Sequence, residues 1–303
     1  MAWYRVAGQE LYFDCPIGEL TPFQIAVRKN GTANRAVPFI SPSFLRKEWQ
    51  AVFSVLVPPV LICQTVGWVA DAKRSVETWS AFRGFLLRVA GGSDFFISRD
   101  GQTVQSLNRT EPPGMLNETD RQILLGPALV FALALRAVWC LHASAVMRGR
   151  SIIAFLAESG QGKSTLAAYL SQNAPWRLVA DDILPVGLAA GGVQVMPHFP
   201  QLKLAVDVQP ATGLAERLPL TNVCLLERIG VKQDPELQTI TTAQGLQALL
   251  SHIAGTRMFD STLLARHLKF CAQAAPQVSF HRLSYPHRRD ALPGIAEILR
   301  TIC

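Results

Sequence analysis

The sequence predicts an α/β fold in the second half of the chain, preceded by a β-rich N-terminal region. Beyond residue 141, short apolar runs typical of buried strands alternate with stretches of helical spacing, and a glycine-rich loop joins one such strand to a helix. In the first hundred residues, short apolar runs are separated by turn signals such as Gly91-Gly92 and Asp100-Gly101. We therefore expect two domains, residues 1–116 and residues 117–303.

The composition excludes a disordered chain and narrows the class of partner. Of the 303 residues, 49% are hydrophobic and 17% are charged, which is enough apolar material for a sizeable core. The formal net charge of +7 suits a nucleotide, an acidic peptide or a nucleic acid. The basic residues are scattered, however, in runs no longer than the pair Arg288-Arg289. This scatter favours small anions or acidic peptides, and we expect no nucleic-acid partner.

The cysteines and the apolar stretches bear on the compartment. The six cysteines form no C-x-x-C pair and no cluster of zinc-like spacing, which is typical of a reducing compartment. The start of the chain lacks the basic end and apolar stretch of a signal peptide. Residues 51–70 are interrupted by Pro58-Pro59, and residues 127–141 carry Arg136 and are short for a bilayer span. We therefore expect a cytoplasmic protein with no membrane partner.

Local signals place the expected elements along the chain. In the N-terminal region we expect strands near 82–87 and 95–98, followed by a helix that Asn117 and Asp120 cap and that runs to about Trp139. In the second half the expected strands are 142–147, 151–157, 177–182, 222–227 and 278–283, with a tight turn at 148–150, and the expected helices are 164–172, 261–274 and a C-terminal one with Ile295, Ile298 and Ile302 on one face. The order of strand, glycine loop, helix and strand ending in acid is that of a P-loop nucleotide-binding unit.

The glycine loop carries the strongest chemical signal. Residues 157–165 read Ala-Glu-Ser-Gly-Gln-Gly-Lys-Ser-Thr and match the pattern G-x-x-x-x-G-K-[ST], except that Ala157 stands in the place of the first glycine. Because Gly160 and Gly162 lack a Cβ, successive backbone N–H groups can turn inward around phosphate oxygens. The following helix adds the positive end of its dipole. An ordinary Gly-Ser turn is the alternative, but the flanking strand and helix favour phosphate binding.

The loop predicts ATP and Mg²⁺ as ligands. Lys163 would contact the β- and γ-phosphates, and the Ser164 hydroxyl would bind Mg²⁺. The residues expected to surround the nucleotide phosphates are Ser159, Gly160, Gln161, Gly162, Lys163, Ser164 and Thr165.

Two adjacent acids, Asp181 and Asp182, end the next apolar strand. An acid at this place in a P-loop fold holds Mg²⁺, and the second could act as general base towards an acceptor hydroxyl. Neighbouring side chains of an extended strand point to opposite faces, so both acids reach one site only if the backbone turns there. The alternative is that one of them merely caps the turn that begins at Ile183.

Two further residues are left open by the sequence. His142 is either a structural histidine or an active-site one, since its strand lies beside the P-loop strand if residues 148–150 form a hairpin. Lys203 is either a cationic contact to phosphate or to a peptide carboxylate, or a lysine that faces solvent on an alternating strand.

The combination of these segments resembles the catalytic domain of HPr serine kinase/phosphorylase. The resemblance covers residues 141–182, from His142-Ala-Ser-Ala-Val through the glycine loop to Leu178-Val-Ala-Asp-Asp. It implies an α/β P-loop kinase core of the type shared with phosphoenolpyruvate carboxykinase. It further implies that Lys163 and Ser164 bind phosphate and Mg²⁺ and that His142 belongs to the active site. Of the acids, it implies Asp181 as base and Asp182 as the metal ligand.

Beyond Asp182 the sequence departs from HPr kinases. Their arginine-containing glycine-rich signature is missing, and residues 197–204 (Pro-His-Phe-Pro-Gln-Leu-Lys-Leu) stand there instead. Residues 200–204 and 278–286, together with the β-rich N-terminal half, resemble the HPr-kinase-related enzymes of lasso-peptide biosynthesis. That resemblance implies an ATP-dependent serine kinase whose partner is a precursor peptide, phosphorylated on its C-terminal residue.

Other functions stay open at this point. The chain could be an HPr-type protein serine kinase, or a nucleotide-binding scaffold that hydrolyses ATP slowly. A small-molecule kinase or a carboxykinase-like enzyme is a further alternative. A true carboxykinase ranks last, because it needs additional metal and oxyacid ligands that the sequence does not supply. The sequence leaves open whether the chain forms a homo-oligomer.

Overall fold

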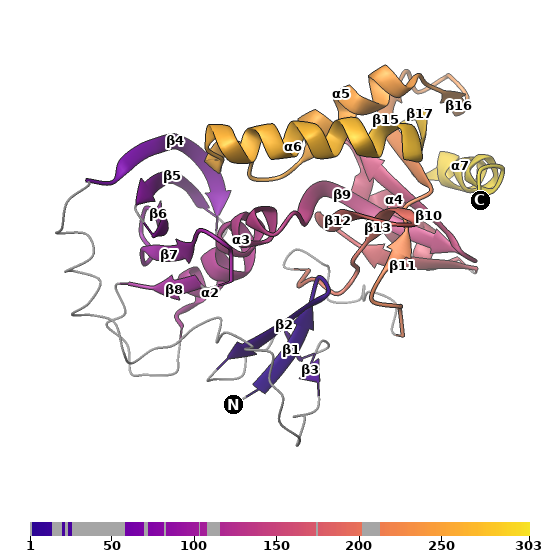
Figure 1. The fold of residues 1–303 in the computed structure, drawn as a ribbon. Coiled ribbons are helices and arrows are strands. Elements are labelled where there is room, and N and C mark those ends of the chain that lie inside the picture. Colours follow the sequence, from indigo (N-terminus) through magenta and orange to yellow (C-terminus); the bar gives the residue numbers. More distant parts are fainter. Residues whose placement is uncertain are drawn as a thin grey trace. The chain divides into compact units, whose positions relative to one another are not determined.

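The fold is mixed α/β, as a computed structural model of the chain shows (Figure 1). The structure describes residues 2–13, 20–21, 24–25, 58–69, 72–81, 83–102, 104–107, 116–173, 175–201 and 213–303. It divides into two compact units. The first unit comprises Met1–Val138 and Gly255–Ala265, and the second comprises Trp139–Ala254 and Arg266–Cys303. The expected division into residues 1–116 and 117–303 assigns residues 117–138 to the second domain, whereas the structure places them in the first unit. As a division into functional domains, 1–116 and 117–303 stay a prediction.

The first unit is built mainly on an antiparallel meander of five strands in the order β4-β5-β6-β7-β8. The strands are β4 (Val60–Val69), β5 (Ala72–Ala81), β6 (Gly84–Val89), β7 (Phe95–Ser98) and β8 (Val104–Ser106). The expected strands near 82–87 and 95–98 correspond to β6 and β7. Gly91 and Gly101, which signalled turns, adopt φ values of 81° and 66°. A second, three-stranded sheet of β1 (Ala2–Val6), β2 (Gln9–Phe13) and β3 (Gln24–Ile25) has the order β2-β1-β3.

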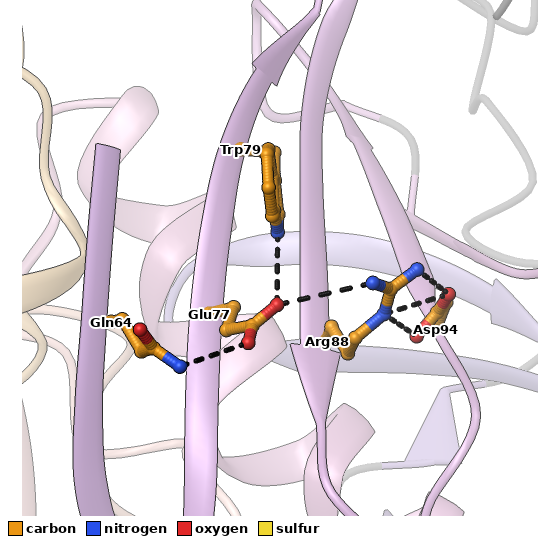
Figure 2. A network of polar contacts seen from close by, with 5 residues as sticks. All are labelled: Gln64, Glu77, Trp79, Arg88 and Asp94. Atoms are coloured by element: carbon orange, nitrogen blue, oxygen red, sulfur yellow. Dashed lines mark hydrogen bonds and ion pairs between the residues drawn. The ribbon is translucent and has the colours of Figure 1, made fainter. Parts of the chain in front are cut away.

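A row of polar side chains crosses three strands of this meander (Figure 2). Gln64 of β4 lies opposite Glu77 of β5, which lies opposite Arg88 of β6. Gln64 Nε2 and Trp79 Nε1 each donate to Glu77 at 3.2 Å, and Arg88 bonds both carboxylate oxygens of Asp94. The hydrogen bond that Arg88 donates to Asp94 raises the pKa of Arg88. Because Gln64 and Arg88 are exposed and the other three side chains are half-buried, solvent screens the ionic contacts and the row contributes little to stability.

The helical segment after residue 117 differs from the single helix expected to run to Trp139. Asn117 does cap its start, accepting a bond from the N–H of Asp120 at 2.8 Å. The segment then divides into α2 (Glu118–Ile123), the π-helical η2 (Leu124–Ala128) and α3 (Leu129–Leu135). Pro127 has no N–H to donate, and Gly126 leaves helical geometry with φ −98° and ψ −106°. Trp139 belongs instead to the first strand of the second unit.

The second unit contains a nine-stranded mixed sheet in the order β14-β13-β12-β9-β10-β15-β17-β16, with β11 also paired to β9. The strands are β9 (Trp139–Arg148), β10 (Ser151–Leu156), β11 (Trp176–Ala180), β12 (Ile183–Ala189), β13 (Gly192–Val195), β14 (Leu218–Pro219), β15 (Asn222–Ile229), β16 (Glu236–Thr239) and β17 (Ser279–Pro286). Strands β9 and β10 form the expected hairpin, with Gly149 at φ 60° in its turn. Strands β10, β15 and β17 run parallel, so their carboxyl ends meet at one edge.

Four α-helices accompany this sheet along the described part of the chain: α4 (Lys163–Ser171), α5 (Thr242–His252), α6 (Ser261–Ala274) and α7 (Leu292–Arg300). Of these, α6 begins in the first unit and continues in the second. Short 3-10 turns lie at η3 (Thr256–Met258), η4 (Ala275–Gln277) and η5 (Arg289–Ala291). Helices α4 and α7 pack into one core through Leu166, Leu170, Ile295 and Leu299. On α7, Ile295 and Leu299 are buried, and Ile302, which lies beyond the end of the helix, packs against the same core.

No helix among the described residues is long and apolar enough to cross a membrane. The apolar stretch around residues 60–69 forms β4. The described cysteines are free, and burial raises the pKa of Cys271 to about 12.

Candidate functional site

The glycine loop leaves β10 at Leu156 and enters α4 at Lys163. Gly160 and Gly162 lie in the left-handed region, with φ values of 79° and 96°, where a side chain would strain the backbone. The first intrahelical bond runs from Leu166 N to Gly162 O at 2.9 Å. The N–H groups of the three residues between them therefore lie at the open end of the helix, where an anion is favoured. This strand–loop–helix arrangement is the one that the sequence predicted.

Side chains from two neighbouring strands donate hydrogen bonds to backbone carbonyl groups of the loop. Tyr285, near the end of β17, donates its hydroxyl to the carbonyl oxygen of Gln161 at 2.5 Å. Arg228, near the end of β15, donates to the carbonyl oxygen of Gly160 and also to Nε2 of His287 at 2.9 Å. Burial raises the pKa of the Tyr285 hydroxyl, so it remains a donor at neutral pH.

These contacts were not predicted, because the sequence does not show which strands lie beside the P-loop strand. Parallel strands that neighbour the P-loop strand must end beside the loop, so polar residues at their carboxyl ends are candidates for contact with it. Arg228 and Tyr285 lie near the carboxyl ends of β15 and β17.

Lys163 lies at the base of the loop and is only 6% exposed. Its ammonium donates to the carbonyl oxygens of Ala157 at 2.7 Å and Glu158 at 3.3 Å. Ser159, Ser164 and Thr165 are exposed, on the loop and on the first turn of α4. The hydroxyl groups and the helix N-terminus are therefore accessible, whereas the ammonium is held against the start of the loop.

The two acids lie where β11 gives way to β12. Both strands pair with β9, β11 with its second half and β12 with its first half. Asp182 is the centre of a three-residue turn, with φ 70°, that Ile183 N closes by donating to Asp181 O at 3.0 Å. A γ-turn of this sense is rare and strained. Strain of this kind persists only where the surrounding structure imposes it, and here β9 pairs with the chain on both sides of the turn.

This turn brings both carboxylates to one face of β9. Asp181 is 7% exposed, and its carboxylate accepts a bond from the Ser144 hydroxyl, while its N–H donates to Gln201 at 2.7 Å. Asp182 Oδ1 lies 3.2 Å from Nε2 of His142. His142 and Ser144 are two residues apart on a strand and so share a face. An uninterrupted strand would have sent the two acids to opposite faces.

The face in question is the one that α4 covers. Ser144 lies opposite Phe155 of β10, and cross-strand neighbours project to the same side. Phe155 packs in the same core cluster as Leu166 of α4. His142, Asp181 and Asp182 therefore lie on the same side of the sheet as the helix that begins at the glycine loop.

The expected site residues thus divide into two groups. The structure brings together on one side of the sheet the glycine loop with Lys163, Ser164 and Thr165, the two acids, and His142. Lys203, the further cationic candidate, lies outside the described residues. The roles assigned to all of these residues stay predictions.

The donor set suits Mg²⁺ that arrives with a nucleotide. Within the described ranges, no group of three or more His, Cys, Asp or Glu side chains could hold a metal ion. Mg²⁺, however, commonly uses one or two protein oxygens together with water and phosphate oxygens. The exposed Ser164 hydroxyl and the Asp182 carboxylate are oxygen donors of this kind.

Comparisons with known proteins leave the family open. No protein-family model matches the chain, and no curated protein matches it. Among solved structures, the HPr(Ser) kinase/phosphatase from Coxiella burnetii aligns with a TM-score of 0.30 and 11% sequence identity. The alignment covers 54% of this chain and 94% of that one. A likeness this weak establishes neither family nor activity, so the HPr-kinase and lasso-peptide resemblances stay hypotheses.

Proposed function

We propose that the chain is an ATP-dependent kinase that transfers the γ-phosphate of ATP to a hydroxyl group. The observation that carries the proposal is that Asp181, Asp182 and His142 lie on the side of the sheet where the glycine loop opens into α4. A phosphate-binding loop alone would suit any nucleotide-binding protein. Carboxylates on the same side add the groups that phosphoryl transfer to a hydroxyl needs.

In this proposal the loop and α4 bind the phosphates through backbone N–H groups, and Lys163 turns from its loop carbonyls to the β- and γ-phosphates. Mg²⁺, held by Ser164 and Asp182, would neutralise developing charge on the phosphates. One carboxylate accepts the proton of the acceptor hydroxyl as the hydroxyl oxygen attacks the γ-phosphorus in line, and the bond from the γ-phosphorus to the β–γ bridging oxygen breaks to release ADP. The transferred group is stabilised by the same N–H groups and by the ammonium.

The division of work between the acids is part of the proposal. The family resemblance favours Asp181 as base and Asp182 on the metal side. Asp181, however, is buried beneath the Ser144 hydroxyl, whereas the Asp182 side chain is 23% exposed and paired with His142. Exposure alone therefore favours Asp182 as the acid that meets the acceptor, and asparagine variants of the two residues distinguish the assignments.

The acceptor we propose is the C-terminal serine of a lasso-peptide precursor. The support for it is the resemblance of residues 200–204 and 278–286 and of the β-rich N-terminal half to the kinases of such pathways. The net charge of +7 also suits a peptide that ends in a free carboxylate. An HPr-type protein acceptor is the alternative within the same reaction class.

The test uses γ-labelled ATP with Mg²⁺ and two peptides that differ only in a C-terminal Ser or Ala. Label on the serine peptide alone is the expected result. Lys163→Ala should abolish it, while Lys232→Ala, which removes an exposed lysine of the same unit, should not. Label released only as inorganic phosphate would favour the scaffold with slow ATP hydrolysis. Full transfer by a folded Lys163→Ala variant would refute the assignment of the loop.

A further inference from the structure

Two carbonyl groups of the glycine loop accept hydrogen bonds from side chains of β15 and β17. Tyr285 donates to Gln161 O at 2.5 Å, and Arg228 donates to Gly160 O. The two side chains come from adjacent parallel strands, in which Arg228 lies directly opposite Tyr285. One ordered pair of residues thus contacts two consecutive peptide groups of the loop.

The direction of these bonds matters for the ligand. A phosphate-binding loop works when successive N–H groups point to the anion, and the carbonyl groups of those peptides then point away from it. A donor that binds a carbonyl oxygen on the outer side therefore favours the conformation in which the N–H groups point inward. The bond from Tyr285 to Gln161 O is of this kind, because the same peptide carries the N–H of Gly162. In the peptide that Arg228 binds, the N–H of Gln161 donates to Glu158 O at 3.3 Å, so the bond to Gly160 O fixes that turn of the loop.

Steric contact adds to the effect at Gly162, the residue that precedes α4. A Cβ placed on Gly162 would lie 2.7 Å from Tyr285 Oη and 3.9 Å from His287 Cδ2. The tyrosine hydroxyl thus lies against the loop backbone at the point where the chain turns into the helix. His287 in turn accepts a bond from Arg228 at 2.9 Å, which orients the guanidinium towards the loop.

We propose that Tyr285 and Arg228 are positioning residues for the nucleotide: Tyr285 holds the Gln161 carbonyl so that the N–H of Gly162 faces the phosphate, and Arg228 fixes the turn at Gly160, so that the loop is preorganised for phosphate. The inference rests on the proposed function and deepens it. These residues are then expected to contribute to affinity for the phosphates without taking part in the transfer itself. Preorganised loops bind more tightly because less conformational freedom is lost on binding.

The test compares nucleotide binding in matched variants. Tyr285→Phe removes only the donor, and Tyr169→Phe, on α4 against the same core, is its control. Arg228→Gln removes the guanidinium, and Arg282→Gln, which loses an ion pair with Glu227 3.5 Å away on the same two strands, is its control. The dissociation constants of Mg·ADP and Mg·ATP and the melting temperature are measured for each.

We expect each site variant to weaken Mg·ADP binding roughly five- to ten-fold, the effect of one hydrogen bond, with an unchanged melting temperature. KM for ATP should rise while kcat changes little, and the backbone N–H resonances of Gln161 and Gly162, which share peptide groups with the bound carbonyls, should shift even without nucleotide. Arg228→Lys keeps a donor and should recover part of the affinity. The control variants should bind as the wild type does.

The failure of this inference is distinguishable from the failure of the proposed function. Wild-type protein that binds Mg·ADP, together with Tyr285→Phe and Arg228→Gln variants of equal affinity, would overturn the positioning role alone. Wild-type protein that binds neither nucleotide would overturn the proposed function and the inference with it. A lower melting temperature together with unchanged affinity in the variants that remain folded would assign the two residues a purely structural role.

Discussion

At the scale of single residues, the proposed mechanism depends most on which of the two acids is the base and which binds the metal. Asp181 is buried under Ser144, and Asp182 pairs with His142 from a strained turn. Asparagine is the right substitution because it tolerates the left-handed φ of Asp182 and cannot accept a proton. The variant that loses the base should keep Mg·ATP affinity and lose transfer, roughly a hundred-fold or more. The variant that loses the metal contact should lose Mg·ATP affinity as well.

Both quantities are measured for Asp181→Asn and Asp182→Asn, as Mg·ATP binding by calorimetry and as phosphopeptide formed in a single turnover. If the two variants behave alike in both assays, the acids do not have separate roles. Wild-type transfer by both variants would refute the kinase mechanism altogether.

The His142 side chain is coupled to Asp182, because its Nε2 lies 3.2 Å from Asp182 Oδ1. We expect His142→Ala to lower transfer less than the variant that removes the base, since the imidazole orients a carboxylate and is not the only proton acceptor. The combined His142→Ala and Asp182→Asn variant should lose less than the sum of the two single effects. Transfer rates of the four proteins give the coupling, and strict additivity would separate His142 from Asp182. A loss of melting temperature in His142→Ala that matches its loss of activity would make the histidine structural.

At the scale of elements, the glycine loop offers a matched pair of substitutions. Gly160 and Gly162 both have positive φ, but a Cβ on Gly160 meets no atom within 4 Å, whereas one on Gly162 lies 2.7 Å from Tyr285 Oη. Gly160→Ala should therefore cost only the backbone strain, about 1 kcal/mol. Gly162→Ala should cost more and should displace Tyr285 from the loop. Urea unfolding and Mg·ADP binding measure the two effects, and equal losses in both variants would show that the contact with Tyr285 is unimportant.

The elements also show what the sequence could predict. The hairpin of β9 and β10, the loop and α4 were predictable because each has a strong local signal: an apolar run, a glycine pair, helical spacing. The sequence also predicted that Asp181 and Asp182, which follow β11, are candidate site residues. Their convergence was not predictable, because it depends on the positive φ of Asp182 and on pairing with β9. The Tyr285 and Arg228 contacts depend on the strand order β10-β15-β17, which no local pattern encodes.

The sequence predicted two helical segments incorrectly or not at all, residues 117–139 and α5. Residues 117–139 are apolar enough for one helix, but Pro127 and the pairing of Trp139 with Val186 of β12 divide the segment. Helix α5 was missed, although Thr241 and Gln244 form a capping box that marks its start. The first division therefore depends partly on tertiary pairing, whereas the start of α5 has a local signal.

At the scale of the whole molecule, we expect the stability of the second unit to depend on pH through three of its histidines. Burial lowers the pKa of His252, His267 and His281 below the ordinary value of 6.5. In the unfolded chain each takes up a proton near that ordinary value, while in the folded protein each stays neutral to lower pH. The unfolded state therefore binds more protons in this range, and stability falls as the pH drops below about 6.5. The loss levels off once the pH is below the folded-state pKa values.

His281 is the best place to test this dependence. It is 7% exposed, and its Nε2 lies 3.2 Å from Asn222 Oδ1. His281→Gln keeps a donor towards Asn222 and removes the titrating group. The melting temperature of the wild type should fall between pH 7.5 and pH 5.5, and the fall should be smaller in His281→Gln. His287→Gln, which changes an exposed histidine of the same unit, should follow the wild type. The same fall in all three proteins would mean that protonation of His281 does not limit stability, and that the pH dependence arises at other groups of the fold.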